Sequence, residues 1–433
     1  MGDSLLVLWR ILIMKKAPVF LLLCLSLALL CGCVFPLQHV SPDPAPVSVP
    51  PSPAAVFNPS DFAIPAPAAD DTAEAEGSSS KPAESRSDPT VIDDPKLAVF
   101  WYAMADAQVF SFREQFGPVL EASGLPFREF DAENDRYRQL DQIRDAVSGG
   151  WNLLAVQLVD NRSADEASEI LELAAGIPVV FFDRMPDSTL FEDLLSAQPG
   201  NVGLICTSPA ELGSIQGKMI GDYLTAHFSV TDLNQDGQIR YTFLTGDRND
   251  SSALTLTQRS LDSANAALAG EGYRSLVYLD EEDTLGFQAD PAGAWSSDAG
   301  TALIRSDLEF YNYANGNMIE LIAANNDDMA LGALTALQAA RCNLGDGVSV
   351  TIPLFGIGAT PAARMAVSLG QMTGTVDRNT AGFAEAVLAT VRGLAAGQSA
   401  ASVFSSLAAS SDLFSVPDGE IPTLYVRPLP VLS

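Results

Sequence analysis

The chain has 433 residues, with 24 basic and 54 acidic side chains and a formal net charge of −30. A surface so acidic repels polyanions, which excludes nucleic acid as a partner. Only two histidines occur, His39 and His227, and no G-x-S-x-G or H-E-x-x-H motif is present, so we expect no enzyme activity. The length is too great for one hydrophobic core and indicates several parts.

The first segment has the pattern of a bacterial lipoprotein signal peptide. Lys15 and Lys16 precede an apolar run over residues 17–30, which ends in Leu30-Cys31-Gly32-Cys33. A transmembrane anchor is the alternative, but about 14 apolar residues are short for a membrane span. We therefore predict a signal peptide over residues 1–32, with Met14 as the initiator. An acyl chain on Cys33 would then anchor the protein outside the cytoplasm, on the cell membrane of a bacterium.

The next segment, residues 33–95, has the composition of a disordered tether. Thirteen of the chain's 27 prolines lie in it, mixed with Ala, Ser, Asp and Glu. No periodic apolar pattern occurs there. Such a segment is extended, and we expect it to hold the folded part of the chain away from the membrane.

Beyond Pro95 the apolar period alternates along the chain. Short apolar runs have the length of buried strands, at Leu97–Trp101, Leu153–Leu158, Val179–Phe182, Val202–Ile205, Thr242–Leu244, Ser275–Leu279, Ile319–Ala323, Ile352–Phe355 and Met372–Val376. Helical patterns lie between most of them, at Ser111–Ala122, Tyr137–Ser148, Ala164–Ala174, Pro209–His227, Ala253–Ala269, Asp327–Ala340 and Ala381–Ala396. This alternation predicts an α/β fold in which helices cover both faces of parallel sheets.

One loop has the spacing of a calcium-binding loop. Asp232, Asn234 and Asp236 stand at positions 1, 3 and 5, and Gly237 follows at position 6. Two features depart from an EF-hand, because Phe243 replaces the glutamate of position 12 and Arg240 offers no oxygen at position 9. The alternative is a turn rich in Asp and Asn that holds no metal.

The chain resembles the periplasmic galactose/glucose-binding proteins from Leu97 to its C-terminus. The resemblance rests on Asp232-Leu-Asn-Gln-Asp-Gly-Gln238 and on the downstream segment from Ile319 to Ala333, which contains Ala324-Asn325-Asn326-Asp327. Shorter matches follow the family's order, at Ile177–Phe182, Ile215–Gly217, Ile352–Gly356 and Gly374–Val376. The resemblance implies the type I periplasmic binding protein fold, which has two Rossmann-like lobes with parallel sheets.

The same resemblance implies that the chain passes three times between the lobes, near Thr207, Arg378 and Val426. The N-terminal lobe would then comprise residues 96–207 and 378–426. The C-terminal lobe would comprise residues 208–377 and 427–433.

The resemblance also implies that the loop binds Ca²⁺. Its ligands would be Asp232, Asn234, Asp236, the backbone carbonyl of Gln238 and a bidentate Glu320. The positive charge of Arg240 would weaken this site unless its guanidinium reaches solvent. In the rival arrangement, Arg240 pairs with the same carboxylates and takes the place of the metal.

Three residues match ligand-contacting positions of the family, namely Asp106, Trp295 and Asn326, and Phe110 matches a fourth if two extra residues are accepted after Asp106. A sugar needs an aromatic ring against its apolar face and carboxylates or amides for its hydroxyls. Three of these residues also have a purely structural alternative, because Asp106 and Asn326 stand where they would cap helices and Trp295 suits ordinary packing.

Other ligand positions differ from the family. Asp183 stands for an asparagine, Asp250 for a histidine, and Arg378 (or the shifted Asn379) for another asparagine, while Ser252, Leu256 and Gly358 replace an aspartate, an arginine and an aspartate. We keep Asp183, Asp250 and Arg378 as candidate ligand-binding residues. Glucose or galactose in the family's pose would lose most of its hydrogen bonds, so we expect a different ligand or weak binding.

The sequence therefore predicts a lipid-anchored, monomeric solute-binding protein of an ABC importer. It would bind a small polar ligand, a sugar such as a galactose- or glucose-like monosaccharide, and deliver it to an ABC permease. The alternatives are a ligand-sensing lipoprotein that docks on a chemoreceptor or sensor kinase, and a degenerate structural homologue.

Overall fold

The structure is a computed structural model that describes residues 90–185, 189–196, 200–283, 285–418 and 422–432. They belong to one compact unit, which begins at Ala83. The predicted signal peptide, Cys33 and nearly all of the predicted tether lie outside the described residues. Among the described helices, none combines the length and the apolar character that a membrane span requires.

The first sheet has seven described strands in the order β12-β13-β5-β4-β3-β1-β2. All neighbours are parallel except the pair β12 and β13. The strands are β1 (Leu97–Trp101), β2 (Phe127–Asp131), β3 (Leu153–Val156), β4 (Val179–Phe182), β5 (Val202–Cys206), β12 (Phe414–Ser415) and β13 (Thr423–Val426). The central strands are wholly buried, as their continuous apolar runs require.

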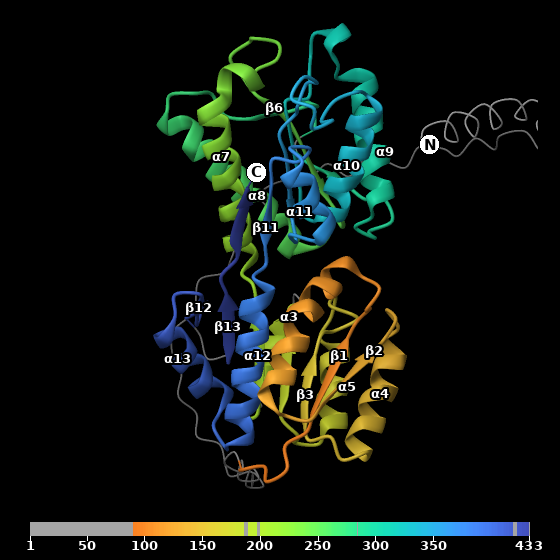
Figure 1. Ribbon diagram of the computed structural model, residues 1–433, viewed down its shortest axis with the longest axis vertical. Coiled ribbons are helices and arrows are strands. Elements are labelled where there is room, and N and C mark those ends of the chain that lie inside the picture. Colours follow the sequence, from red (N-terminus) through yellow and green to blue (C-terminus); the bar gives the residue numbers. More distant parts are fainter. Residues whose placement is uncertain (1–89, 186–188, 197–199, 284, 419–421, 433) are drawn as a thin grey trace, which may run out of the picture. The chain divides into compact units, whose positions relative to one another are not determined.

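Helices cover both faces of this sheet, and together they form the N-terminal lobe (Figure 1). The helices are α3 (Ala107–Ser123), α4 (Arg136–Ser148), α5 (Asp165–Ala174), α6 (Thr189–Ser196), α12 (Thr380–Ala395) and α13 (Ala400–Ser410). Side chains of α3, α12 and α13 pack with one face of the sheet. Those of α4, α5 and α6 pack with the other face.

The second sheet runs in the order β14-β11-β10-β9-β6-β7, and β8 also pairs with β6. Among the described strands of this second sheet, only the pair β11 and β14 is antiparallel. The strands are β6 (Arg240–Thr245), β7 (Val277–Tyr278), β8 (Gln288–Ala289), β9 (Leu321–Ala324), β10 (Leu354–Ile357), β11 (Gly374–Asp377) and β14 (Leu429–Leu432).

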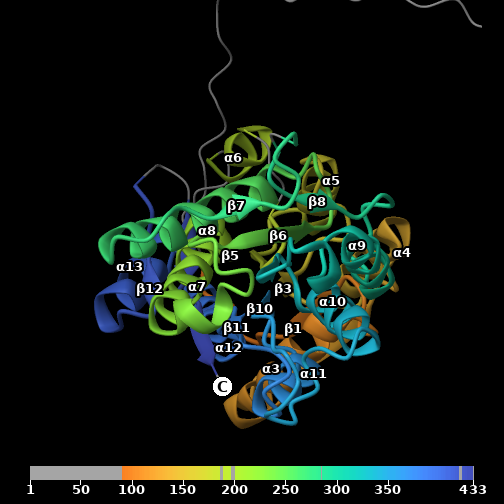
Figure 2. The same cartoon turned by 90° about the horizontal axis from the view of Figure 1, so that it is seen from above.

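This sheet and its helices form the C-terminal lobe, whose helices surround the sheet in Figure 2. The helices are α7 (Pro209–Thr231), α8 (Ser251–Gly270), α9 (Ser297–Phe310), α10 (Asp327–Ala339) and α11 (Pro361–Ser368), with a short 3₁₀ turn at Tyr313–Asn315. One core lies between the sheet and α7 and α8. The other lies on the side of α9, α10 and α11.

Helices α7 and α8 approach closely because α7 carries glycine at every fourth position of the contact. A Cβ atom added to Gly213 would lie 2.2 Å from the Leu256 carbonyl oxygen, and one on Gly217 would lie 2.1 Å from that of Ser260. The Gly213–Gly217 spacing therefore belongs to a helix–helix contact and not to a phosphate-binding loop.

The chain passes between the two sheets three times. It leaves the first sheet after β5, returns from β11 into α12, and leaves again between β13 and β14. The assignment of strands to the two sheets thus follows the type I arrangement, in which β13 belongs to the first sheet and β14 to the second.

Several elements differ from their predicted bounds. The strand predicted at Ser275–Leu279 is reduced to Val277–Tyr278, and α7 continues four residues beyond His227, where the backbone leaves helical geometry at φ −125°. Helix α3 begins at Ala107, before the predicted Ser111. The edge strand β2 and helix α9 are absent from the predicted elements.

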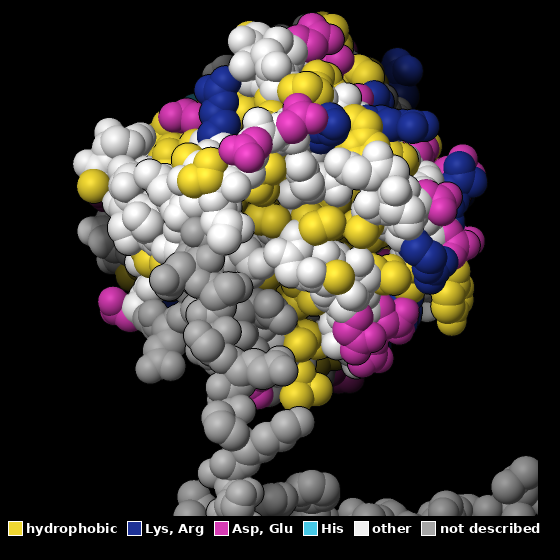
Figure 3. Space-filling model, turned by 90° about the horizontal axis from the view of Figure 1, so that it is seen from below, with side chains coloured by type: hydrophobic (Ala, Val, Ile, Leu, Met, Phe, Trp, Pro, Cys, Tyr) yellow, Lys and Arg dark blue, Asp and Glu magenta, His cyan; other side chains and the backbone are white. Residues whose placement is uncertain are grey.

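The acidity of the chain is not gathered into one patch on the face seen in Figure 3. Lys and Arg side chains are interspersed there with Asp and Glu and with hydrophobic side chains. Charged side chains of both signs are thus exposed to solvent on this face.

Candidate ligand-binding site

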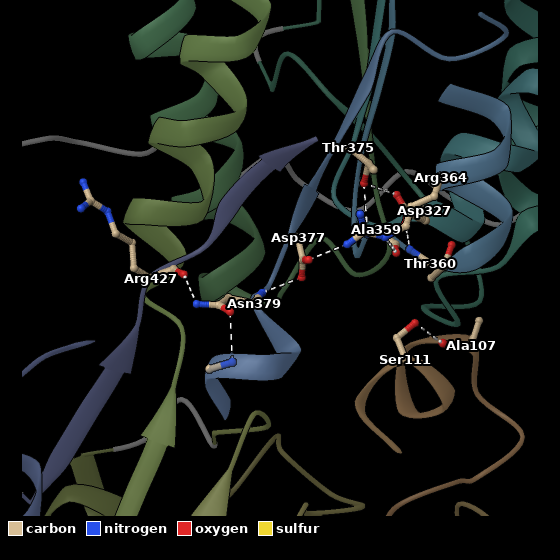
Figure 4. A network of polar contacts seen from close by, with 11 residues as sticks. Ala107, Ser111, Asp327, Ala359, Thr360, Arg364, Thr375, Asp377, Asn379 and Arg427 are labelled. Atoms are coloured by element: carbon tan, nitrogen blue, oxygen red, sulfur yellow. Dashed lines mark hydrogen bonds and ion pairs between the residues drawn. The ribbon is translucent and has the colours of Figure 1, made fainter. Parts of the chain in front are cut away.

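Segments that follow strands of both sheets line one hollow of about 380 Å³, which we call the inter-lobe hollow. The residues that line it are Met104, Ala105, Ala107, Phe110, Asp328, Leu331, Thr360, Pro361 and Ala362. Figure 4 shows Ala107 and Ser111 at the start of α3 across from Thr360. Carboxyl ends of parallel strands are where open α/β sheets bind ligands, so this is the candidate site.

Asp106 and Phe110 come from the first turn of α3. Asp106 caps the helix by accepting hydrogen bonds from the amides of Gln108 and Val109, at 2.8 and 3.1 Å. Burial and the charge of Asp106 raise the pKa of Tyr102. The ring of Phe110 is 47% exposed and lines the inter-lobe hollow, so it is available to a ligand.

Asp183 and Arg378 contact each other. The Asp183 carboxylate accepts a hydrogen bond from Gln157 Nε2 at 2.8 Å and pairs with Arg378 at 3.3 Å. Asp183 follows β4 and Arg378 follows β11, so the ion pair joins segments that belong to different sheets. Asp183 also has a left-handed backbone, with φ 63°. Both predicted ligand residues are therefore partnered within the chain.

Trp295 lies directly over Gly246. A Cβ atom added to Gly246 would stand 1.9 to 2.2 Å from three atoms of the indole ring, so only glycine fits there. Trp295 has φ 58°, a left-handed conformation that is unusual for a bulky residue. Its carbonyl accepts a hydrogen bond from Asn326 Nδ2 at 2.9 Å. The ring is half-buried and keeps a surface for a ligand.

Asn326 and Asp250 both cap helices. Asn326 Oδ1 accepts from the Met329 amide at 3.0 Å at the start of α10, and Asp250 accepts from the Ala253 amide at 3.0 Å at the start of α8. Capping does not exclude ligand contact, because a carboxylate or amide oxygen has more than one lone pair. Neither residue lines the inter-lobe hollow.

Two glutamines near these residues were not among the predicted site residues. Gln108 reaches the C-terminal lobe, since a Cβ atom on Gly358 would lie 2.7 Å from its Oε1. Its Nε2 and the Oε1 of Gln157 are enclosed atoms with no hydrogen-bond partner in the described structure. Glutamine is a common surface residue, so the positions of these two glutamines in the sequence do not indicate a binding site.

A polar network connects the C-terminal lobe to the crossing segments (Figure 4). The buried Asp327 accepts from Thr375 Oγ1 at 2.6 Å and from the Thr360 amide at 2.7 Å, and burial raises its pKa to about 6. Farther along, Asp377 accepts from the Asn379 amide at 2.7 Å, and Asn379 Nδ2 donates to the Arg427 carbonyl at 3.1 Å. Two of the three crossing segments are thereby hydrogen-bonded to each other.

The loop with calcium-like spacing is closed by hydrogen bonds from its own backbone. Asp232 accepts from the amides of Asp236 and Gly237, at 3.1 and 2.9 Å. Asn234 Oδ1 accepts from the Asp236 amide at 3.0 Å, and Asp236 Oδ1 from the Gln238 amide at 2.9 Å. Oxygen atoms from positions 1, 3 and 5 thus take part in one tight turn.

Glu320, far along the sequence, joins this loop. Its Oε1 accepts from the amides of Leu233 and Asn234, at 2.7 and 3.3 Å, and its Oε2 from the Arg240 amide at 2.9 Å. The residue is fully buried, and burial raises its pKa. The structure therefore brings Glu320 to the loop, as the family resemblance implies.

Arg240 points to another partner. Its guanidinium pairs with Glu281 at 2.8 Å, so the rival arrangement, in which it bridges the loop carboxylates, is not the one found. Within the described ranges, no group of three or more His, Cys, Asp or Glu side chains is placed to hold a metal ion. The expected calcium ligands include an amide and a backbone carbonyl, and calcium at this loop stays a prediction.

A family model described as a periplasmic binding protein domain matches residues 97–399. The chain belongs to the periplasmic binding protein family. Proteins of this family are extracytoplasmic transport components without catalytic activity, so the chain is a binding protein and not an enzyme.

Relatives and solved structures agree with this family. The D-galactose/methyl-galactoside binding periplasmic protein of Haemophilus influenzae is 31% identical over 71% of this chain and 83% of its own length. A solute-binding protein from Actinobacillus succinogenes with bound D-allose has a TM-score of 0.56 at 16% identity, covering 78% of this chain and 97% of that one. The myo-inositol binding protein of Caulobacter has a TM-score of 0.53 at 19% identity, over 79% and 94%. At such identities the solved structures show the fold.

Proposed function

We propose that this periplasmic binding protein captures a sugar-like polyol between its two lobes and delivers it to the permease of an ABC importer. Closure of the lobes on the ligand would create the surface that the permease recognises. The equilibrium shifts only as far as the ligand binds the closed form better than the open one. Cys33 would carry the lipid anchor.

The observation that carries this proposal is the inter-lobe hollow and its surroundings. Phe110 supplies an exposed ring from the N-terminal lobe, and Trp295 supplies a second ring from the C-terminal lobe. Enclosed amide atoms of Gln108 and Gln157 without partners would be satisfied by ligand hydroxyls. The related proteins named above bind galactosides, allose and inositol, which are all small polyols.

Calorimetric titration with a panel of neutral sugars, amino sugars and cyclitols tests this function. Once a ligand is found, Trp295→Ala should weaken its binding by about 1–3 kcal/mol through lost stacking area. The melting temperature of the ligand-free variant should stay close to that of the wild type. A large drop in ligand-free stability with unchanged affinity would assign Trp295 to the core instead, and a panel with no binding would contradict the function.

We further propose that Ca²⁺ binds the loop of Asp232, Asn234 and Asp236 together with the Gln238 carbonyl and Glu320. The donors are all oxygen atoms, which suits a hard cation. Arg240 pairs with Glu281, so its charge is partly neutralised and directed away from the loop carboxylates. Bound calcium would supply a cation to carboxylates that otherwise repel one another.

Titration of chelator-treated protein with CaCl₂ tests the metal. We expect heat in the wild type, no heat in Glu320→Gln, and wild-type heat in Asp222→Asn, which removes an exposed carboxylate paired with Lys218. Arg240→Gln should bind at least as well as the wild type. Heat in the Arg240→Gln variant alone would show that the arginine takes the metal's place. If neither the wild type nor any variant gives heat, the calcium proposal is wrong.

A further inference from the structure

The inter-lobe hollow contains one charged side chain, that of Asp328, in otherwise mostly apolar surroundings. The hollow's one hydroxyl belongs to Thr360, which caps α11 by accepting from the Ala363 amide at 3.4 Å. Asp328 lies in the first turn of α10 and is half-buried. Its carboxylate therefore dominates the electrostatics of the hollow.

A second carboxylate acts on Asp328 from the opposite lobe. Burial and then the negative charge of Asp106 raise the pKa of Asp328. The described part of the chain provides no hydrogen bond or ion pair to the Asp328 carboxylate. Two like charges on different lobes oppose closure unless something between them is positive.

The arginines that follow nearby strands are engaged elsewhere. Arg378 pairs with Asp183, and Arg364 pairs with Asp377. Arg184 lies 4.1 Å over the ring of Tyr102 and donates to the Val159 carbonyl. None of these three guanidinium groups neutralises Asp328, so the protein leaves this charge for a ligand.

We propose that the ligand carries a protonated amine, as amino sugars and aminocyclitols do, and that its ammonium group is bound in the inter-lobe hollow by Asp328. This inference rests on the proposed function and names the chemical class that the cleft selects. An ammonium offers three N–H donors and one positive charge, and hydrogen bonds between charged groups are the strong ones. The exposed ring of Phe110 in the same hollow is suited to a cation.

The same arrangement explains selectivity. A neutral polyol of the same shape leaves the repulsion between Asp106 and Asp328 in place, so closure around it is less favourable. An ammonium bridges the two lobes only when they are together, which gives the differential affinity that closure requires. Discrimination against the neutral analogue thus arises from a repulsive element as well as an attractive one.

Calorimetry at pH 6.5 with matched compounds tests the inference. The probes are D-glucosamine and D-galactosamine, their N-acetyl forms, and D-glucose and D-galactose. We expect the free amines to bind at least about tenfold tighter than both neutral forms, a difference of about 1.4 kcal/mol. Asp328→Asn should abolish this advantage. Asp298→Asn removes an exposed carboxylate from the first turn of α9 and should retain the advantage.

The outcomes separate the two proposals. Equal affinity for an amine and its neutral partners overturns the amine inference and leaves the solute-binding function intact. A preference for amines that survives in Asp328→Asn also overturns it, because another residue would then bind the ammonium group of the ligand. Binding of none of these compounds, and of no member of the wider panel of neutral sugars, amino sugars and cyclitols, contradicts the function itself. The melting temperature of ligand-free Asp328→Asn, expected to equal or exceed that of the wild type, shows that the variant folds.

Discussion

Asp327 is a buried carboxyl group whose contacts do not need its charge. Its two partners, Thr375 Oγ1 and the Thr360 amide, both donate to it. An asparagine oxygen can still accept from the Thr360 amide, and its amide nitrogen can donate to the Thr375 hydroxyl once that hydroxyl turns. Burial raises the pKa of Asp327 to about 6 from an ordinary 3.8. The folded state therefore holds this proton more firmly than the unfolded chain does.

The sign of the pH dependence follows from linkage. A raised pKa means that the stabilisation is full below about pH 4 and is lost as the pH rises to about 6. We predict that Asp327→Asn flattens the fall in unfolding free energy across this range. At pH 7 the variant should be more stable by up to about 2–3 kcal/mol. Urea unfolding at pH 4, 5, 6 and 7 measures this.

The comparison must be between variant and wild type at each pH. Burial also raises the pKa of Asp307 to about 6 and that of Glu166 to about 7, and these groups contribute the same slope to both proteins. An Asp327→Asn protein whose slope equals that of the wild type would show that Asp327 is ionised at little cost.

At this scale, the sequence alone predicted which residue types follow the strands but not their partners. Asp106, Asp250 and Asn326 were each assigned to the ligand, with capping as an alternative for Asp106 and Asn326, and all three cap helices. A ligand contact and a cap both require a short polar side chain directly after a strand. Spacing therefore cannot distinguish them.

Among the elements, the contact between α7 and α8 depends on glycine. A methyl group on Gly217 would overlap the Ser260 carbonyl oxygen, which belongs to the backbone of α8 and cannot move alone. We predict that Gly217→Ala lowers the unfolding free energy by about 1–3 kcal/mol, as overpacking does. Thermal or urea unfolding measures the change.

Gly117 provides the matched control. It also lies inside a helix, α3, but a Cβ atom there would meet nothing within 4 Å. Gly117→Ala should raise stability by up to about 1 kcal/mol through helix propensity. If both variants gained stability, the two helices would have to separate without penalty, and the close contact would be unimportant.

Elements with continuous apolar runs were predicted best, because burial on both faces leaves a strong pattern. Strands β1 and β4 have their predicted bounds. Strand β2 reads Phe-Arg-Glu-Phe-Asp and lies at the sheet edge, where polar residues are allowed, so its pattern is weak. The C-terminal strands β13 and β14 are short and flanked by prolines, so the sequence pattern does not predict them as strands.

For the whole molecule, attachment to the membrane depends on one residue outside the described structure. Because Leu30-Cys31-Gly32-Cys33 fits a lipobox, we predict that Cys33→Ser abolishes acylation and leaves the protein unprocessed or released from the membrane fraction. Palmitate labelling and fractionation of cells measure this. Cys31→Ser is the control, and it should be acylated normally. Full labelling of Cys33→Ser would mean that the anchor lies elsewhere.

The contacts between the lobes could not be predicted from the sequence. Asp183 and Arg378 are 195 residues apart and were both assigned to a ligand, yet they pair with each other. Asp328 was not predicted at all, although it lines the inter-lobe hollow. Such relations depend on how two sheets approach, and no local pattern in the chain carries that information. The family resemblance predicts the fold, whereas the position of the Asp328 carboxylate in the inter-lobe hollow is known only from the structure.

The last strands bear on the order in which the protein is made. Strand β13 pairs with β5 in the first sheet, and β14 pairs with β11 in the second, so each sheet takes one strand from residues 423–432. Neither sheet can pair all of its described strands while residues 423–432 are still inside a ribosome or a translocation channel. Both sheets therefore acquire their full set of described strands at the same late stage of synthesis, although their first strands are made much earlier.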